Sequence, residues 1–182
     1  DVLPQRKQNP SAKLPLIGRV ALPANAATSA QVAVRWSVEP ATLDLEAVST
    51  TGASALNLVL RKGALAPGAS YTFTLQATYR RVTSASTVSV LMNRAPFGGD
   101  LTLTYEAPAL ALSTTVVLTA AEWVDDDPND LPLTYAFGYA SRDAAADAAA
   151  LTPLGKSSIA ASASWLPPAG NWSLSVAVSD VY

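Results

Sequence analysis

The 182-residue sequence contains no cysteine and no histidine. The lack of cysteine excludes disulfides and thiolate zinc sites, so cysteine usage points to neither an oxidising nor a reducing compartment. The lack of histidine removes the commonest general base and the commonest transition-metal ligand. A serine nucleophile would then need a lysine base, and the few lysines lie in no known catalytic pattern. The sequence therefore predicts a protein that is not an enzyme.

Charge and long apolar runs are also scarce. Only 14% of the residues are charged, and the 12 basic and 14 acidic residues are spread thinly along the chain. This pattern excludes the clustered basic patch that nucleic acid or an anionic membrane surface requires. No stretch approaches the roughly 18 to 20 apolar residues of a membrane-spanning helix, so no membrane span is expected within this window. With 49% hydrophobic residues, the chain can nevertheless build a core.

An internal repeat organises the sequence. The segment Leu65–Ala77 returns as Leu166–Val178, and every matched pair is 101 residues apart. The same offset relates two runs with apolar residues at every second position, namely Val32, Val34, Trp36 and Val38 in the first copy and Leu133, Tyr135, Phe137 and Tyr139 in the second. Alternation with period two predicts a half-buried strand, so both copies contain the same strands.

Further strands are expected between turn signals in both copies, and the residue ranges are 55–60, 87–92, 101–105, 115–121 and 158–165. We predict an all-β fold of two tandem immunoglobulin-like (fibronectin III-like) β-sandwich domains, 1–94 and 95–182. A short helix is expected at 143–150. The repeat projected onto the chain ends predicts that the first domain has its first strand missing or partial and that the second lacks its last strand. More of the protein, or a partner strand, should complete such an edge.

Two aromatic residues hold equivalent positions in the copies. The spacing of Leu65, Pro67 and Tyr71 resembles the pattern leading into strand F of fibronectin III domains, where the tyrosine hydroxyl bonds nearby backbone in a tyrosine corner. Trp172 takes this place in the second copy. Because an indole only donates, the corner bond there must differ or be absent, and simple core packing of both rings is the alternative.

The densest polar cluster lies in the loop 122–130. Carboxylates at close spacing suit calcium, which takes six to eight oxygen ligands. The candidate ligands are Asp125, Asp126, Asp127 and Asp130. A solvated turn, in which these side chains bond local backbone, is the alternative interpretation. A glycosidase is not expected, because it needs two carboxyl groups held at a defined separation in a concave site.

One triplet, Asn171-Trp172-Ser173, matches the acceptor pattern for N-linked glycosylation. Modification of Asn171 would indicate a secreted protein. A chance match is the alternative, since Trp172 is expected to face the core.

Two motifs of the second copy indicate a relative. The opening Asn93-Arg-Ala-Pro96-Phe-Gly98-Gly99 and the later Trp123-Val-Asp-Asp-Asp-Pro-Asn-Asp-Leu131-Pro132-Leu133-Thr134-Tyr135-Ala-Phe137 resemble the REJ (receptor for egg jelly) module of polycystin-1-like proteins. The resemblance implies an extracellular part of a large membrane protein, displayed on the cell surface of cilia or gametes. It also implies association with a polycystin-2-like channel subunit, and modules that serve as spacers and adhesive surfaces without catalysis.

Two function hypotheses follow. The first is a structural and interaction module that binds other protein chains or neighbouring modules. The second is a calcium-dependent adhesion or carbohydrate-binding module of a secreted matrix or filament protein.

Overall fold

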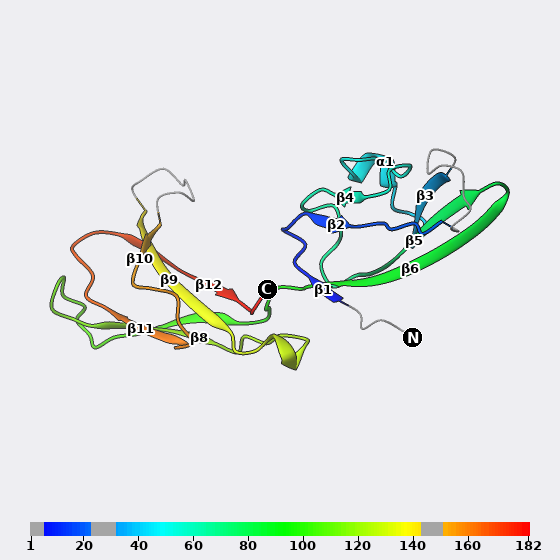
Figure 1. Cartoon of the computed structure of the whole chain (residues 1–182). Coiled ribbons are helices and arrows are strands. Elements are labelled where there is room, and N and C mark those ends of the chain that lie inside the picture. Colours follow the sequence, from blue (N-terminus) through cyan, green and yellow to red (C-terminus); the bar gives the residue numbers. More distant parts are fainter. Residues whose placement is uncertain (1–5, 23–31, 143–150) are drawn as a thin grey trace. The chain divides into compact units, whose positions relative to one another are not determined.

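The computed structural model describes residues 6–22, 32–142 and 151–182, and its regular secondary structure is almost wholly β-strand (Figure 1). The chain divides between Arg94 and Ala95 into two compact units, called unit 1 and unit 2 below. The elements of unit 1 are β1 Arg6–Gln8, β2 Leu14–Leu16, β3 Val32–Glu39, α1 Leu45–Val48, β4 Leu58–Leu60, β5 Ser70–Tyr79 and β6 Val82–Met92. The elements of unit 2 are β7 Asp100–Thr104, β8 Val116–Ala121, η2 Pro128–Asp130, β9 Thr134–Ser141, β10 Thr152–Pro153, β11 Ser162–Trp165 and β12 Trp172–Ser179. The all-β prediction is confirmed.

Unit 1 packs a four-stranded sheet, in the order β1-β6-β5-β3, against the two-stranded sheet β2-β4. All neighbours are antiparallel except β1 and β6, which run parallel. Alternate residues of the strands point inward, as period-two patterning requires, and Leu58, Leu60 and Phe73 have no exposed surface. The core of unit 1 therefore lies between two sheets, which defines a β-sandwich.

A tight hairpin joins β5 to β6. Its two-residue loop is Arg80-Arg81, and both residues have positive φ, 46° and 72°. Two-residue hairpin loops need this left-handed backbone to match the twist of the strands, although arginine does not favour it. The guanidinium of Arg80 lies 5.2 Å from the ring centroid of Tyr79, where a cation–π contact partly offsets that strain.

Unit 2 has two three-stranded sheets, in the orders β11-β8-β7 and β10-β9-β12. All their pairs are antiparallel. Its buried core is smaller than that of unit 1 and centres on Val116, Leu118, Ala120 and Phe137. Three rings pack beside this core at one end: the centroid of Tyr139 lies 4.8 Å from that of Trp165 and 5.5 Å from that of Trp172.

The repeat predicted from the sequence is confirmed by strand register. In unit 1, Trp36 pairs with Leu75 across β3 and β5. In unit 2, Phe137 pairs with Val176 across β9 and β12, with both partners displaced by 101 residues. Because one slipped residue would turn every side chain to the other face, an identical register means that the same positions face the two cores.

Two local predictions need comment. The strand expected over 55–60 is shorter, because the indole Nε1 of Trp36 donates hydrogen bonds to the carbonyl oxygens of Ala55 and Leu56 and holds that stretch in turns. Pairing with β2 begins only at Leu58. The helix expected at 143–150 lies outside the described residues.

Candidate functional site

The acidic loop of unit 2 leaves β8 through a backbone kink. Glu122 has a φ of 60°, and two residues later Val124 exchanges backbone hydrogen bonds of 3.0 and 3.1 Å with Phe97. This isolated bridge fixes the chain just after Trp123, and the pairing of Ala121 with Asp100 fixes it shortly before. Asp125 therefore starts the loop from a defined position.

Two of the predicted ligands organise the loop itself. The Asp125 Oδ1 atom accepts a 3.0 Å hydrogen bond from the Asp127 backbone N–H. Asp127 is the N-cap of η2, and its Oδ1 atom accepts hydrogen bonds from the backbone and the side-chain amide of Asn129, at 3.0 and 2.9 Å. These bonds are the turn chemistry expected of Asp before a short helix.

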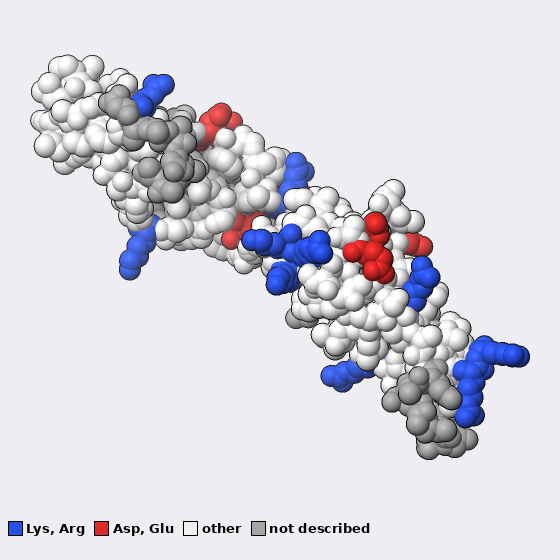
Figure 2. Space-filling view, turned by 90° about the horizontal axis from the view of Figure 1, so that it is seen from above, with Lys and Arg blue, Asp and Glu red and all other residues white. Residues whose placement is uncertain are grey.

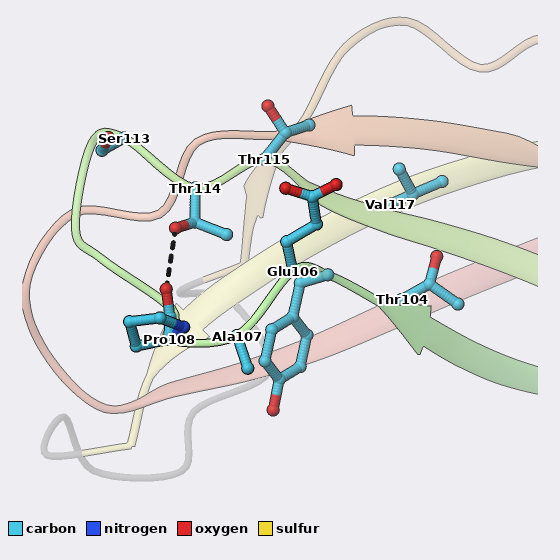
Figure 3. Close-up of a pocket in the computed structure, with 9 residues that line it drawn as sticks. Thr104, Glu106, Ala107, Pro108, Ser113, Thr114, Thr115 and Val117 are labelled. Atoms are coloured by element: carbon cyan, nitrogen blue, oxygen red, sulfur yellow. Dashed lines mark hydrogen bonds between the residues drawn. The ribbon is translucent and has the colours of Figure 1, made fainter.

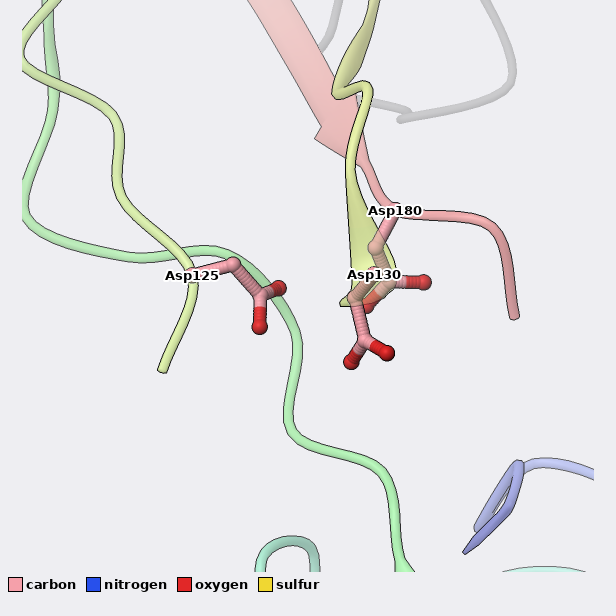
Figure 4. Close-up of side chains that lie close together, drawn as sticks. All are labelled: Asp125, Asp130 and Asp180. Carbon is pink, nitrogen blue, oxygen red and sulfur yellow. The ribbon is translucent and has the colours of Figure 1, made fainter. Parts of the chain in front are cut away.

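Three carboxylates lie close together at this loop. Asp125, Asp130 and Asp180 each offer an oxygen atom, and the three atoms lie within 4.8 Å of one another (Figure 4). Asp130 is only 1% exposed, and the Oδ2 atom of Asp125 is buried without a hydrogen-bond partner. We call these three residues the aspartate trio. Asp126 is exposed, and neither it nor Asp127 belongs to the trio.

Sequence reasoning missed Asp180, which follows Asp130 by fifty positions. Sheet register explains its place: Thr134 at the start of β9 pairs with Ser179 at the end of β12, so the residues just beyond this pair lie side by side. The offset of 101 residues could have predicted that the start of β9 and the end of β12 lie side by side. It aligns β9 with β3 and β12 with β5, which pair with each other in unit 1.

The trio offers oxygen ligands of the kind that hard cations prefer. Carboxylate oxygens are the preferred protein ligands of calcium, and three of them supply part of the six to eight that the ion takes.

The glycines of the Pro96-Phe-Gly-Gly motif serve packing. Gly99 lies against the ring of Trp123 so closely that a Cβ atom at this position would overlap the indole. Gly98 has a φ of 79°, a left-handed conformation that glycine adopts without steric cost. The two motifs on which the family resemblance rests thus meet in one contact. The indole Nε1 of Trp123 is buried there without a hydrogen-bond partner.

A pocket of about 780 Å³ opens beside the segment that links β7 to β8 (Figure 3). Tyr105 and Glu106 line it, and the Thr114 hydroxyl closes one side by donating a 3.2 Å hydrogen bond to the carbonyl oxygen of Pro108. Glu106 is the single acidic residue among the described lining residues. The pocket therefore does not supply the pair of carboxylates that glycoside hydrolysis needs.

The glycosylation triplet lies at the start of β12. Asn171 and Ser173 are exposed, while Trp172 between them is partly buried. The backbone carbonyl of Asn171 accepts a 3.0 Å hydrogen bond from Arg142 N–H. Its side chain is accessible, as attachment of a glycan requires.

The surface carries few charges. Most of the face seen in Figure 2 is neither basic nor acidic, in keeping with the low charged fraction of the sequence. Over the part of the chain that the structure describes, no helix is long and apolar enough to cross a membrane.

The chain is a tandem β-sandwich module, because unit 1 and unit 2 each pack two sheets around a core. Unit 2 also carries the Trp123–Gly99 contact and the acidic loop. The REJ domain family model matches residues 4–182, and the chain belongs to this family. Human polycystin-1 is 36% identical over 93 residues, which is 50% of this chain and 2% of that relative. The predicted resemblance is confirmed.

Two solved structures align along most of the chain at low identity. A crystal structure of titin domains A168–A170 aligns with 97% of this chain and 56% of its own chain, with 12% sequence identity and a TM-score of 0.45. A crystal structure of the FN1–FN3 domains of chicken CNTN1 aligns with 96% of this chain and 57% of its own chain, with 13% sequence identity and a TM-score of 0.39.

Proposed function

We propose that this chain is a non-catalytic extracellular module of a large polycystin-1-like cell-surface protein. It acts as a spacer and as a protein-binding surface, its parent is displayed on the ciliary membrane, and that parent associates with a polycystin-2-like channel subunit. The observation that carries the proposal is the REJ family match over residues 4–182. The identity with human polycystin-1 supports the same parent class.

The physical properties of the units support a spacer. Each unit buries its own apolar side chains between two sheets, so packed strands set the dimensions of each unit. The absence of histidine and the scarcity of charge leave little chemistry for acid–base catalysis. Exposed apolar side chains on unit 2, among them Leu103 and Leu110, give it contact area for protein partners.

A replacement experiment tests this proposal. In the full-length parent protein at the surface of ciliated cells, residues 1–182 are exchanged for an unrelated pair of β-sandwiches of similar length. Surface delivery should persist, because length is preserved, whereas recovery of the channel subunit in co-purification should fall. Unchanged recovery would contradict the role as a binding surface. Resistance of the native segment to protease added outside intact cells, together with its cleavage after permeabilisation, would contradict the extracellular location.

A calcium-dependent adhesion module is the second candidate. The favouring observation is the aspartate trio, in which one carboxylate oxygen of Asp125 is buried without a hydrogen-bond partner. Calcium bound there would tie the loop after β8 to the end of β12, because Asp125 and Asp180 come from these two places. Adhesion that depends on this part of the surface would then require the ion.

A further inference from the structure

The charges of this chain are divided by sign between the two units. Unit 1 contains ten basic and four acidic residues, whereas unit 2 contains two basic and ten acidic residues. Their net charges at pH 7 are therefore +6 and −8, although the whole chain carries only −2. Opposite net charges steer two proteins toward each other even where the charges are thinly spread. Two copies of the chain thus attract each other when unit 1 of one copy meets unit 2 of the other.

The hairpin loop between β5 and β6 presents two adjacent guanidinium groups. Arg80 and Arg81 are exposed, and both hold a left-handed backbone, with φ of 46° and 72°, that Asn and Gly adopt more readily. The next residue, Val82, is 69% exposed. Backbone strain of this kind concentrates at functional positions, where the side chain and not the fold determines which residue is present. We call residues 80–82 the basic tip.

The basic tip has donors to offer to a partner. Arg80 lies over the ring of Tyr79, a contact within the hairpin itself. Within residues 6–22, 32–142 and 151–182, Arg81 makes no hydrogen bond and no ion pair. A planar guanidinium group carries five N–H donors in a geometry that matches a carboxylate. The tip is therefore suited to an acidic protein surface.

The loop 122–130 of unit 2 has the complementary surface. It contains five acidic residues and no basic residue. Glu122, Val124 and Asp126 are exposed, and Val124 is exposed to 49%. Glu122 also has a φ of 60°, so an acidic residue stands on strained backbone here as two basic residues do in the hairpin loop. We call these three exposed residues the acidic rim.

The acidic rim is open to a partner and separate from the aspartate trio. Over the described part of the chain, neither Glu122 nor Asp126 makes a hydrogen bond or an ion pair through its carboxylate. Neither residue belongs to the trio. Two carboxylates thus accompany an exposed valine on unit 2, as two guanidinium groups accompany Val82 on unit 1.

We propose that the basic tip of one copy binds the acidic rim of a second copy of this chain. The two guanidinium groups pair with the two carboxylates, and Val82 packs against Val124. Guanidinium–carboxylate pairs are charge-assisted and bidentate, so they fix orientation as well as adding affinity. The second copy is the occupant because this chain itself carries both surfaces and both net charges. The contact joins unlike surfaces, which makes it heterologous.

Sedimentation equilibrium of the intact chain at low ionic strength tests this contact. Exposed ion pairs are individually weak and are screened by salt, so the native chain should associate reversibly and at least tenfold more weakly in about 0.5 M salt. Replacing Arg80-Arg81 by Asn-Gly should also weaken association at least tenfold. The same replacement suits the backbone of the loop, so the urea midpoint should not fall and lost association cannot be attributed to unfolding.

Charge reversal identifies the two surfaces. Arg80→Glu with Arg81→Glu should abolish association, and Glu122→Arg with Asp126→Arg should do the same, because like charges then face each other. A chain with all four changes should associate again, since tip and rim are once more complementary. Rescue of this kind depends on the tip meeting the rim and is not expected from loss of structure.

A matched control separates the tip from the net charge of unit 1. Lys13→Glu with Lys62→Glu changes that net charge by the same amount at exposed positions outside the tip, and it should retain most of the association. Loss equal to that of the tip variant would overturn the proposal. So would a native chain that stays monomeric at millimolar concentration in low salt, or a folded four-residue variant that does not associate. Neither the extracellular location nor a channel partner enters this contact, so its failure would leave the proposed function standing.

Discussion

The indole Nε1 of Trp172 donates a 3.0 Å hydrogen bond to the carbonyl oxygen of Pro168. At the equivalent place in unit 1, the hydroxyl of Tyr71 accepts a 3.1 Å hydrogen bond from the backbone N–H of Ala66. The two corners therefore tie an aromatic ring to the preceding loop with opposite polarity. An indole cannot accept such a bond, so the loop of unit 2 presents a carbonyl where unit 1 presents an N–H.

These corner bonds predict similar losses in two different units. Tyr71→Phe should lower the free energy of unfolding of unit 1 by about 1 kcal/mol, and Trp172→Phe should lower that of unit 2 by at least as much, because ring area is lost with the bond. Urea unfolding followed by circular dichroism measures both. Tyr182→Phe, at an exposed terminal ring, is the control and should change neither transition.

Leu65→Ala and Leu166→Ala form a matched pair. Leu65 is buried, and its truncation should cost unit 1 about 2–5 kcal/mol. Leu166 is half exposed, so the same truncation should cost unit 2 under about 1 kcal/mol. Thermal and urea denaturation would reveal the difference. Equal losses at the two positions would show that the difference in burial between Leu65 and Leu166 does not determine their contribution to stability.

The hairpin loop Arg80-Arg81 can be improved. Replacing it by Asn-Gly should stabilise unit 1 by about 1 kcal/mol or more, because both positions have positive φ and this pair is favoured there. The lost cation–π contact with Tyr79 reduces the gain. A matched variant, Arg80→Lys with Arg81→Lys, keeps the charge without relieving the backbone and should show no gain in the urea midpoint.

Gly99→Ala should destabilise unit 2. The added methyl meets the indole of Trp123, and overpacking of this kind costs about 1–3 kcal/mol. In the background Trp123→Leu the same alanine should cost less, because the ring that it strikes is gone. The four proteins form a double-mutant cycle, and strictly additive losses would show that Gly99 and Trp123 do not interact.

Calcium should raise the melting temperature of unit 2 if it binds the aspartate trio. Replacing Asp125, Asp130 and Asp180 by Asn should remove this rise. Asp126→Asn is the control, because the exposed Asp126 lies outside the trio, and it should keep the rise. Absence of any shift at millimolar calcium in the native chain would rule out the calcium-dependent candidate.

The sequence predicted the fold where side-chain pattern decides structure. Alternation around Trp36 and Phe137 and the offset of 101 residues were enough to predict both strands and their common register. Alternation did not reveal β1, which consists of three polar residues and is recognised as a strand by its pairing with β6. It also could not set the end of the β5–β6 hairpin, where exposed residues continue the ladder beyond the core.

The candidate site was predicted in part for the same reason. Local spacing drew attention to Asp125 and Asp130, but it also drew in Asp126 and Asp127, because neighbours in sequence look equivalent before the loop is folded. The side chain of Asp127 caps η2 instead. Asp180 enters the trio through strand pairing, a long-range relationship that spacing within one loop does not contain.

The parallel pairing of β1 with β6 determines how unit 1 responds to force. β1 opens the described part of the unit and β6 closes it, and Arg6, Lys7 and Gln8 pair with Val90, Leu91 and Met92. Tension along the chain pulls these strands in opposite directions along their shared ladder. The inter-strand hydrogen bonds are then loaded together in shear, so they must break as a group before the sandwich can extend. A pair of strands peeled from one end would instead open one bond at a time.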